Sequence, residues 1–542
     1  MPRSPLLRAV IQIAQRIRAS QRLGIPVAAV DELAHIARVR RKESGLPRRR
    51  FLIGAAAAGF AAMRPAWSHL GRAAAPRVAI VGAGISGLAC ALALADAGMK
   101  PTLYEAAPRV GGRMFSNNTG YWTGNQVSEW CGEFIDSSHS TVRGLATRFN
   151  LTLDDVLAAQ PGNAKDTYYF DGSYYSIADA ISDFQAVLPK VQADEAGSYD
   201  NNGELTPLGV RIDRGSLRQW IQKNVPGGVR SRLGQLLDVA YVLEYGAETS
   251  DLSGMNIVDV LSGSDAGFEI VGTSDERYNI RGGNELLPQA IAAYLQQQTI
   301  AIQTSNRLVK LRTLPDNTYR LSFETTNGTS DVDADFVVLT LPFAVLRSLD
   351  YRGAGFDALK RRTIRDLGRG VNGKLQLQFN SRHWNSTGAW GISNGNAYSD
   401  TGLQGTWDVT RAQAGTMGIL NDYTGGRTTQ RMTTKVPFAN ISNANVQIDA
   451  AQFLTQLDPV YPGLSAEWNS KATNSLPHLS PYFQCSYAYW RPGQVNAFAG
   501  TEGLRQGNIL FAGEHTSEEF QGYMEGGAAE GVRAANELIG LL

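Results

Sequence analysis

Residues 77–114 read RVAIVGAGISGLACALALADAGMKPTLYEAAPRVGGRM, and this stretch decides the fold. An apolar, β-rich run leads into Gly82-x-Gly84-x-x-Gly87, and an Ala/Leu-rich helical run follows directly. Gly82 permits a tight turn, Gly84 lets backbone amides approach a pyrophosphate, and Gly87 allows close packing of the helix. The order of strand, turn and helix therefore predicts a Rossmann-like dinucleotide site, with Ser86 in the helical turn that faces the phosphates.

The residues after this helix indicate which dinucleotide binds. A second strand, predicted over 101–104, ends at Glu105, which stands 18 residues after Gly87. A carboxylate at this place grips the ribose hydroxyls and repels the 2′-phosphate of NADP. Gly112 and Arg113 then form a second glycine-rich turn with a cation, which a nicotinamide cofactor does not need and the longer flavin dinucleotide does. These residues favour FAD.

With these motifs the sequence resembles the flavin amine oxidase family, which includes monoamine oxidases, polyamine oxidases and L-amino-acid oxidases. Near the C-terminus, GNILFAGEHTSEEFQGYMEGGAAEGVRAANEL (507–538) is similar to the closing flavin motif of that family. Three middle segments also resemble family landmarks: YNIRGGNELLPQAIAAYL (278–295), DADFVVLTLPFAVL (333–346) and GKLQLQFNSRHW (373–384). The resemblance extends from about residue 76 to the end of the chain.

The resemblance implies an α/β protein in which a Rossmann-like FAD-binding domain is interleaved with an α+β substrate-binding domain. We expect residues 76–150, 282–345 and 482–542 to form the FAD-binding domain. Residues 151–281, largely helical, and 346–481, rich in strands, would form the substrate-binding domain. Ligands then bind in the crevice between the two.

The resemblance also assigns residues to the cofactor. Gly513 and Glu514 would contact the ribityl chain and phosphates. Tyr523 and Met524 open the last helix, whose amides stabilise the negative charge that appears on the reduced flavin. The remaining assignments are the turn over the flavin ring and the strand residue beside the adenine: Gly132, Glu133, Phe134 and Leu308.

On the substrate side, the resemblance implies an aromatic cage and a lysine. Tyr523 matches one wall of the cage and Tyr487 the other, with Tyr489 and Trp490 as alternatives for the second wall. Lys374 matches the family lysine that hydrogen-bonds through a water to the flavin N5. The Leu/Gln alternation that follows Lys374 predicts a half-exposed strand with one face toward the cavity.

Asp136 has two interpretations. It coincides with an acid that polyamine oxidases use to attract a second amine, and it could equally be the N-cap of a helix over 140–150. The turn that contains it lacks the carboxylate-binding arginine of some L-amino-acid oxidases, although Arg214 or Arg218 could serve instead.

The predicted function is an FAD-dependent amine oxidase that deaminates a primary amine or polyamine to an imine and aldehyde, releasing ammonia and hydrogen peroxide. An L-amino-acid oxidase, or an amine dehydrogenase with an electron acceptor other than O2, is the alternative. A flavin-binding scaffold without turnover and a nicotinamide dehydrogenase are further hypotheses. Cys485 is either a structural thiol or a covalent attachment point for the flavin.

The N-terminal extension, residues 1–75, has a separate role. Its first 50 residues hold 12 Lys/Arg and 3 Asp/Glu, a net +9, so the remainder carries −8 against the total of +1. Arg48 and Arg49 stand one residue before Phe51, and the uncharged run from Phe51 to Met63 follows. This pattern predicts a twin-arginine export signal and a periplasmic or secreted protein. The acidic remainder argues against nucleic-acid binding.

The six histidines show no metal-binding spacing, so we predict no metal site. Whether the protein forms a homodimer stays open.

Overall fold

The computed structural model describes residues 75–264, 266–272 and 274–542, and Pro76–Leu542 form one compact unit. The predicted twin-arginine signal at Arg48 and Arg49 lies outside the described residues, as does nearly all of the predicted extension. No helix in the described part of the chain is long and apolar enough to cross a membrane.

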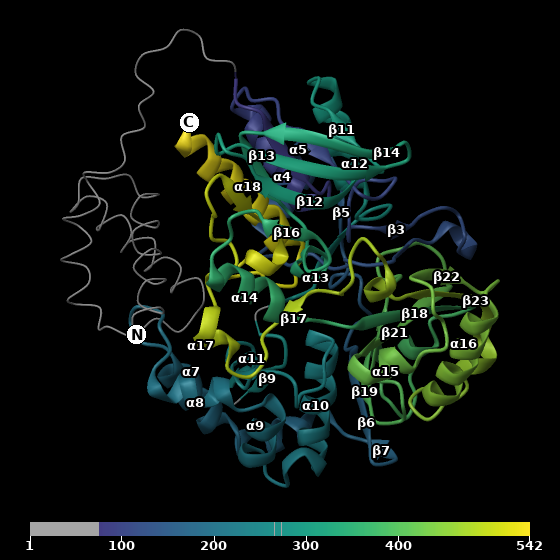
Figure 1. Cartoon of the computed structure of the whole chain (residues 1–542). Helices are drawn as coiled ribbons and strands as arrows, with labels where there is room; N and C mark the ends of the chain where they lie inside the picture. Colours follow the sequence, from purple (N-terminus) through teal and green to yellow (C-terminus); the bar gives the residue numbers. More distant parts are fainter. Residues whose placement is uncertain (1–74, 265, 273) are drawn as a thin grey trace. The chain divides into compact units, whose positions relative to one another are not determined.

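A five-stranded parallel sheet has the strand order β11-β2-β1-β15-β25, and Figure 1 labels its edge strand β11. Its central strands are apolar and buried on both faces, as expected for a parallel sheet covered by helices. The α/β class predicted from residues 77–114 is therefore confirmed. The strands are β1 (Val78–Val81), β2 (Thr102–Tyr104), β11 (Ile302–Gln303), β15 (Phe336–Leu339) and β25 (Ile509–Phe511).

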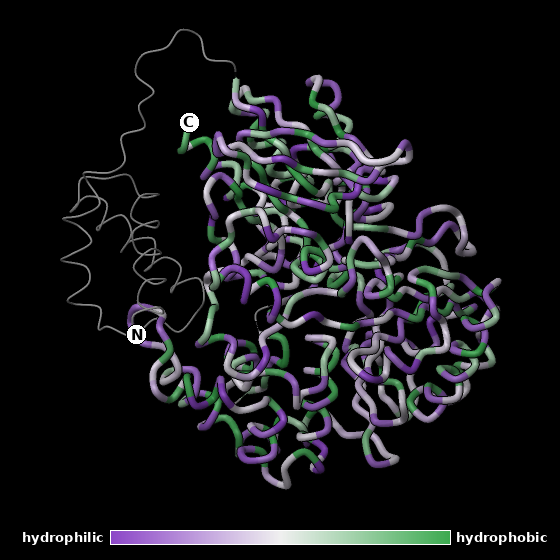
Figure 2. The backbone as a smooth tube through the Cα atoms, viewed as in Figure 1, coloured by the Kyte–Doolittle hydropathy of each residue, from purple (hydrophilic) through white to green (hydrophobic). Residues whose placement is uncertain are grey.

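Helices from both ends of the chain pack together against this sheet: α4 (Ile85–Asp96), α5 (Ser140–Arg148), α12 (Leu286–Gln297) and α18 (Met524–Leu541). Glycine lets α18 approach α4 closely, because a Cβ on Gly531 would lie 2.1 Å from the Ser86 carbonyl oxygen. Buried hydrophobic residues of these helices belong to one core cluster, and Figure 2 colours the hydrophobic residues of the chain green. The contact brings the first turns of α4 and α18 to the same edge of the sheet.

A second, four-stranded sheet lies beside the parallel sheet, with the order β14-β13-β12-β16. Phe323 of this sheet stacks on Tyr104 of β2, with ring centroids 4.4 Å apart, so the two sheets share one hydrophobic core. The strands are β12 (Arg307–Thr313), β13 (Tyr319–Thr325), β14 (Gly328–Ala334) and β16 (Asp350–Gly353). The adjoining helices are α13 (Phe343–Leu346) and α14 (Ala358–Asp366).

An eight-stranded, mainly antiparallel sheet has the order β22-β23-β18-β21-β20-β19-β6-β7. The half-exposed strand predicted after Lys374 is wrong, because β18 is buried along its whole length. Gln376 and Gln378 donate instead to the backbone of residues 123–129, which covers that face. The strands are β6 (Lys165–Phe170), β7 (Ser173–Tyr174), β18 (Asn372–Phe379), β19 (Ser393–Ser399), β20 (Gly405–Asp408), β21 (Gly418–Gly425), β22 (Phe438–Asn440) and β23 (Trp468–Ser475).

A helical cluster packs against this sheet through α10 (Arg232–Tyr245), whose apolar side chains contact β6 and β19–β21. Its other helices are α6 (Ile177–Gln185), α7 (Leu188–Ser198), α8 (Pro207–Arg214), α9 (Leu217–Asn224) and α11 (Met255–Val258). The remaining elements include β3 (Ser116–Asn117), β4 (Ser128–Glu129), β5 (Leu153–Asp155), β8 (Ser262–Ser264), β9 (Gly267–Glu269), β10 (Tyr278–Ile280), α15 (Gly426–Arg431), α16 (Ala444–Leu457), β17 (Gly368–Arg369), β24 (Ala488–Tyr489) and α17 (Gln494–Phe498).

Candidate active site

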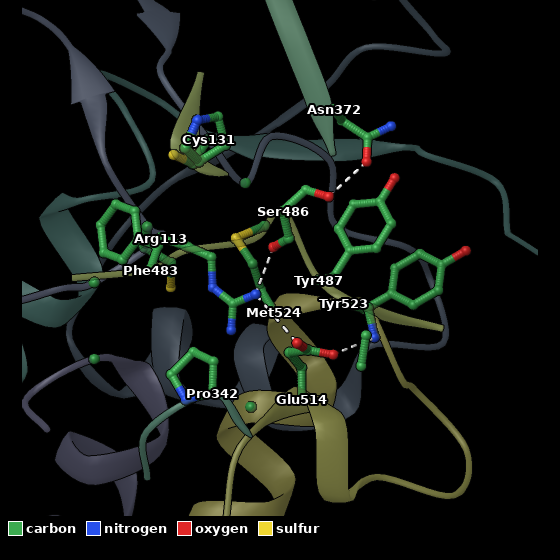
Figure 3. A pocket seen from close by; sticks show the side chains of 18 of the residues that line it. Arg113, Cys131, Pro342, Asn372, Phe483, Ser486, Tyr487, Glu514, Tyr523 and Met524 are labelled. Carbon is green, nitrogen blue, oxygen red and sulfur yellow. Dashed lines mark hydrogen bonds and ion pairs between the residues drawn. The ribbon is translucent and has the colours of Figure 1, made fainter. Parts of the chain in front are cut away.

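A large cavity opens where the parallel sheet, the eight-stranded sheet and α10 meet, with a volume of about 400 Å³, in the range of small-molecule sites. Figure 3 shows part of its lining. The predicted site residues that line it come from distant parts of the sequence: Gly82, Gly84, Ser86, Glu105, Gly112, Arg113, Gly132, Glu133, Phe134, Asp136, Leu308, Lys374, Tyr487, Gly513, Glu514, Tyr523 and Met524.

Gly87 is the one predicted site residue that does not line the cavity. It lies behind the cavity wall, where a Cβ would sit 1.9 Å from the carbonyl oxygen of Gly82. Gly87 therefore acts by letting α4 pack against the first glycine turn, and its contribution to the site is indirect.

The two glycine turns meet at the cavity. A Cβ on Gly112, which has φ +55°, would lie 3.2 Å from the Cα of Gly84. Glu105 fixes the first turn, because its carboxylate accepts the amide protons of Ala83 at 2.7 Å and Ala107 at 2.8 Å. Burial raises the pKa of Glu105. Each carboxylate oxygen has further lone pairs for ribose hydroxyls.

Arg113 joins the second glycine turn to the C-terminal motif, as Figure 3 shows. Its guanidinium donates to the Ser486 carbonyl oxygen at 2.5 Å and to the Glu514 carboxylate at 3.1 Å. The other oxygen of Glu514 accepts the amide proton of Gly522 at 3.0 Å. Residues separated by 401 positions in sequence therefore share one charge-assisted link.

The first turns of two helices supply backbone amides to the same cavity. Gly84 caps α4 and Tyr523 caps α18, and neither cap has a side-chain hydrogen bond to the helix amides. The hydroxyl of Ser86 is buried and has no partner among the described residues. Unpaired donors at helix N-termini favour anionic groups such as phosphates. These donors, with the glycine turns, fit FAD.

Lys374 lies on β18, in the middle of the eight-stranded sheet, and is 6% exposed. Its ammonium group is 2.6 Å from the Glu133 carboxylate and 2.6 Å from the Cys131 carbonyl oxygen. The ammonium also lies 5.5 Å from the centre of the Trp407 ring. The structure thus places Lys374 as a buried, paired cation in the cavity wall.

Tyr487 and Tyr523 lie side by side on the cavity wall (Figure 3). The hydroxyl of Tyr487 is 3.0 Å from that of Tyr423 and donates to the Leu243 carbonyl oxygen at 3.1 Å. Burial raises the pKa of Tyr487 well above its ordinary value, so the phenol is neutral. The alternatives for this wall, Tyr489 and Trp490, pack in hydrophobic clusters away from the cavity lining.

Asp136 lines the cavity and is not a helix N-cap, so the second interpretation of this residue is wrong. The N-cap of α5 is His139, and the amides of residues 141 and 142 donate to the carboxylate of Glu525, each at 2.8 Å. Because Glu525 from α18 already satisfies these donors, Asp136 does not cap α5. Burial raises the pKa of Asp136.

Two further carboxylates line the cavity near Asp136: Glu244 of α10 and Glu276 of the loop before β10. The side chains of both lack a hydrogen bond or ion pair within the described ranges. Burial, followed by repulsion from Asp136, raises the pKa of Glu244 to about 7. Burial also raises the pKa of Glu276 to about 8, and Arg411 opposes that shift. Glu276 has φ +45°, a conformation that a non-glycine residue rarely adopts.

Comparison with known proteins identifies the fold. The family described as flavin containing amine oxidoreductase matches residues 85–539. The chain belongs to this family. It is 24% identical over 501 residues to the putative L-amino-acid oxidase YobN of Bacillus subtilis (strain 168), covering 85% of this chain and 94% of the relative.

Other amine oxidoreductases are similar to this chain over most of its length. Polyamine oxidase 7 of Oryza sativa subsp. japonica is 24% identical over 474 residues, covering 85% of this chain and 94% of that protein. The structure of wild-type putrescine oxidase bound to putrescine superposes with a TM-score of 0.69 at 16% identity, covering 86% of this chain and 99% of that chain. The protein is therefore a flavin-dependent amine oxidoreductase with the α/β fold of these enzymes.

Two sequence alternatives lie outside the cavity of this amine oxidoreductase. Cys485 is 2% exposed, does not line the cavity, and its thiol faces the Phe483 carbonyl oxygen at 3.4 Å. Burial raises its pKa to about 11. Arg214 and Arg218 line a separate surface depression, and Arg218 pairs with Asp238 at 2.5 Å. Neither arginine reaches the cavity that contains Asp136.

Sequence reasoning missed several cavity residues of the amine oxidoreductase. Glu244 and Tyr245 end the apolar helix α10. An acid within such an apolar run could have indicated that Glu244 is a site residue. Glu276 lies in a loop without any pattern that marks it. The missed aromatic residues in the lining include Trp407, Tyr398 and Tyr423, which belong to strands with no distinctive spacing.

Proposed function

We propose that this protein is an FAD-dependent amine oxidase that oxidatively deaminates a primary amine or polyamine. The imine hydrolyses in water to an aldehyde and ammonia, and O2 accepts the electrons to give hydrogen peroxide. Within the family, this substrate class is supported best by three carboxylates in the cavity wall, those of Asp136, Glu244 and Glu276. Asp136 accepts the amide proton of Glu276 and lies 3.4 Å from His139, whereas the side chains of Glu244 and Glu276 have no partner among the described residues.

The charge balance of the cavity carries this proposal. The two arginines in the lining, Arg113 and Arg307, are already paired with Glu514 and Glu324. A substrate carboxylate would therefore meet no free arginine in the lining, while an ammonium group would meet unpaired acids. Opposite charge within a few ångströms favours binding of the cationic substrate. The L-amino-acid oxidase alternative has less support for this reason.

Bound FAD supplies the hydride acceptor, and the protein positions the amine beside it. Tyr487 and Tyr523 provide neutral aromatic walls that exclude water and orient the amine nitrogen. Lys374 lines the cavity and would present an N–H group to a bound flavin. The amides at the start of α18 face the cavity and would stabilise negative charge on a bound flavin.

We propose that FAD is bound without a covalent bond, because the candidate thiol of Cys485 is outside the cavity lining. The residues proposed to hold it are the glycine turns, Glu105, Arg113 and the C-terminal motif. We also propose that 76–150, 282–345 and 482–542 form the FAD-binding domain, since all strands of the parallel sheet fall in these ranges. All strands of the eight-stranded sheet fall in 151–281 and 346–481, the proposed substrate-binding domain.

Export by the twin-arginine route remains a proposal that depends on the sequence of residues 1–75. It would place the enzyme in the periplasm or outside the cell, with FAD inserted before export. Fusion of residues 1–75 to a reporter tests it: export should require Arg48 and Arg49. Export of a double Lys variant at the parent rate would contradict the proposal.

A substrate screen tests the main proposal. Primary amines, polyamines and L-amino acids are offered to the purified protein, and peroxide and flavin bleaching are followed. Diamines and polyamines should reduce the flavin most efficiently, and Asp136→Asn should raise their KM. Reduction by L-amino acids alone would replace this proposal with the L-amino-acid oxidase. Bleaching without peroxide in air would indicate a dehydrogenase.

A further inference from the structure

The ammonium group of Lys374 is fixed by two strong hydrogen bonds. It lies 2.6 Å from Oε2 of Glu133 and 2.6 Å from the carbonyl oxygen of Cys131. Its third proton has only a long contact, 3.4 Å, to the carbonyl oxygen of Glu129. That proton is therefore the one that can be given to a water or to a group bound in the cavity.

The carboxylate of Glu133 is itself fixed on its other side. Oε1 of Glu133 accepts the indole N–H of Trp407 at 2.9 Å. The side-chain amide of Asn284 donates to the carbonyl oxygen of Glu133 at 2.6 Å, so the backbone is fixed as well. The side chain of Glu133 is 4% exposed and that of Lys374 is 8% exposed. This is a buried ion pair with defined geometry.

A buried ammonium group without a counter-ion would lose its proton readily, because burial disfavours the charged form. Glu133 is the carboxylate within hydrogen-bond distance of Lys374 among the described residues. We propose that Glu133 is a positioning residue that keeps Lys374 charged and directs its remaining proton into the cavity. The inference rests on the proposed function, because it acts through the role given there to Lys374.

Other titratable groups surround the pair, and a test must distinguish their effects on the pH profile from the effect of the pair. They are Glu129 and Cys131 on the same turn, Tyr423 opposite Lys374 on β21, Glu276 in the cavity lining, and Arg411, which packs against the Phe134 ring and whose charge acts on Glu276. Burial raises the pKa of Glu129 to about 8 and that of Cys131 to about 11. Since Glu129 and Glu276 can titrate near neutral pH, Glu276→Gln is needed as a control background.

The first test measures flavin re-oxidation and needs no amine. Enzyme reduced with dithionite is mixed with O2 across a pH series, in the parent and in Glu133→Gln and Glu133→Asp. Loss of the counter-ion in Glu133→Gln should move the alkaline limb of the profile by about 1 to 3 pH units toward acid. Glu133→Asp, which keeps the charge, should leave the limb near the parent position, and the shift caused by Glu133→Gln should also appear in the Glu276→Gln background.

Identical limbs in the parent and Glu133→Gln would overturn the inference. An enzyme that no amine reduces, but whose re-oxidation limb shifts as expected, would refute the proposed substrate class and leave the role of Glu133 intact. The two failures are thus distinguishable.

The second test uses thermal unfolding of the purified holoprotein, and its readout does not depend on flavin turnover. Lys374→Met leaves a buried carboxylate unpaired, and Glu133→Gln leaves a buried ammonium unpaired. The double variant removes both charges and should melt at a higher temperature than either single variant. A melting-point loss in the double variant equal to the sum of the two single losses would show that the groups are not coupled, and would overturn the inference.

Discussion

The nucleotide end and the substrate end of the cavity are built in different ways. At the nucleotide end, backbone amides and close glycine contacts form the wall, and the charged groups Arg113 and Glu514 are paired. At the substrate end, side chains form the wall, and the carboxylates of Glu244 and Glu276 have no ion pair within the described ranges. The first end is specified by backbone geometry and the second by side-chain chemistry.

The difference separates cofactor binding from substrate choice. A backbone-built wall accepts few substitutions, because an added Cβ at Gly82 or Gly111 would lie less than 3 Å from a neighbouring oxygen atom. A side-chain wall can change its charge without disturbing the sheets around it. We therefore expect variants at the nucleotide end to lose the cofactor, and variants at the substrate end to change which amine is used.

The largest effect is expected at Gly87, behind the nucleotide end. A Cβ there would lie 1.9 Å from the Gly82 carbonyl oxygen, so Gly87→Val must displace α4 from the first turn. The variant should be isolated colourless or unfolded, as measured by visible absorbance and circular dichroism. Gly540→Ala, a helical glycine with no atom near its Cβ, is the matched control and should keep the parent spectrum. A yellow, folded Gly87→Val variant would contradict the claim that cofactor binding depends on close backbone contacts at the nucleotide end.

A smaller effect is expected from neutralising the substrate end. Glu244→Gln or Glu276→Gln removes a charge that attracts the second ammonium of a diamine, so KM for diamines should rise about tenfold, or about 1.4 kcal/mol. Steady-state kinetics with a monoamine of equal length is the control, and its KM should change little. Equal changes for both substrates would remove these acids from substrate selection.

The preference for diamines over monoamines should depend on pH, because it depends on the ionisation of Glu244 and Glu276. Burial raises the pKa of Glu244 to about 7 and that of Glu276 to about 8. Acids with raised pKa are neutral below these values and ionised above them, so attraction of a diamine appears only as pH increases. The ratio of kcat/KM for diamine over monoamine should increase through about pH 7 to 8. The Glu244→Gln/Glu276→Gln double variant should show a flat ratio, and a rise in that variant would assign the effect to other groups.

The smallest effect is expected at Cys485, which adjoins the cavity without lining it. Cys485→Ser should leave flavin content and amine turnover within about twofold of the parent, since the thiol donates to the carbonyl oxygen of Phe483 and does not line the cavity. Acid precipitation of the parent should release the yellow colour into the supernatant. Colour that stays with the parent pellet, and is released from the variant, would establish a covalent bond.

The glycine turns were predictable because their requirements are local: Gly82 and Gly112 adopt positive φ, and short spacing fixes the turn. The burial of Lys374 could not be predicted from local sequence, because the turn that covers β18 lies about 245 residues earlier in the chain. The cap of α5 was misassigned because Glu525, from the last helix, takes that role. Glu276 has no local pattern, since only the fold carries its loop to the cavity.

The most direct test of the account is an anaerobic titration of the purified protein with a diamine, followed by visible absorbance. The account predicts a yellow protein whose flavin bands bleach on stoichiometric addition of diamine and return when air is admitted. A colourless protein that gains no flavin spectrum when supplied with FAD would contradict the claim that both ends of the chain form one flavin site.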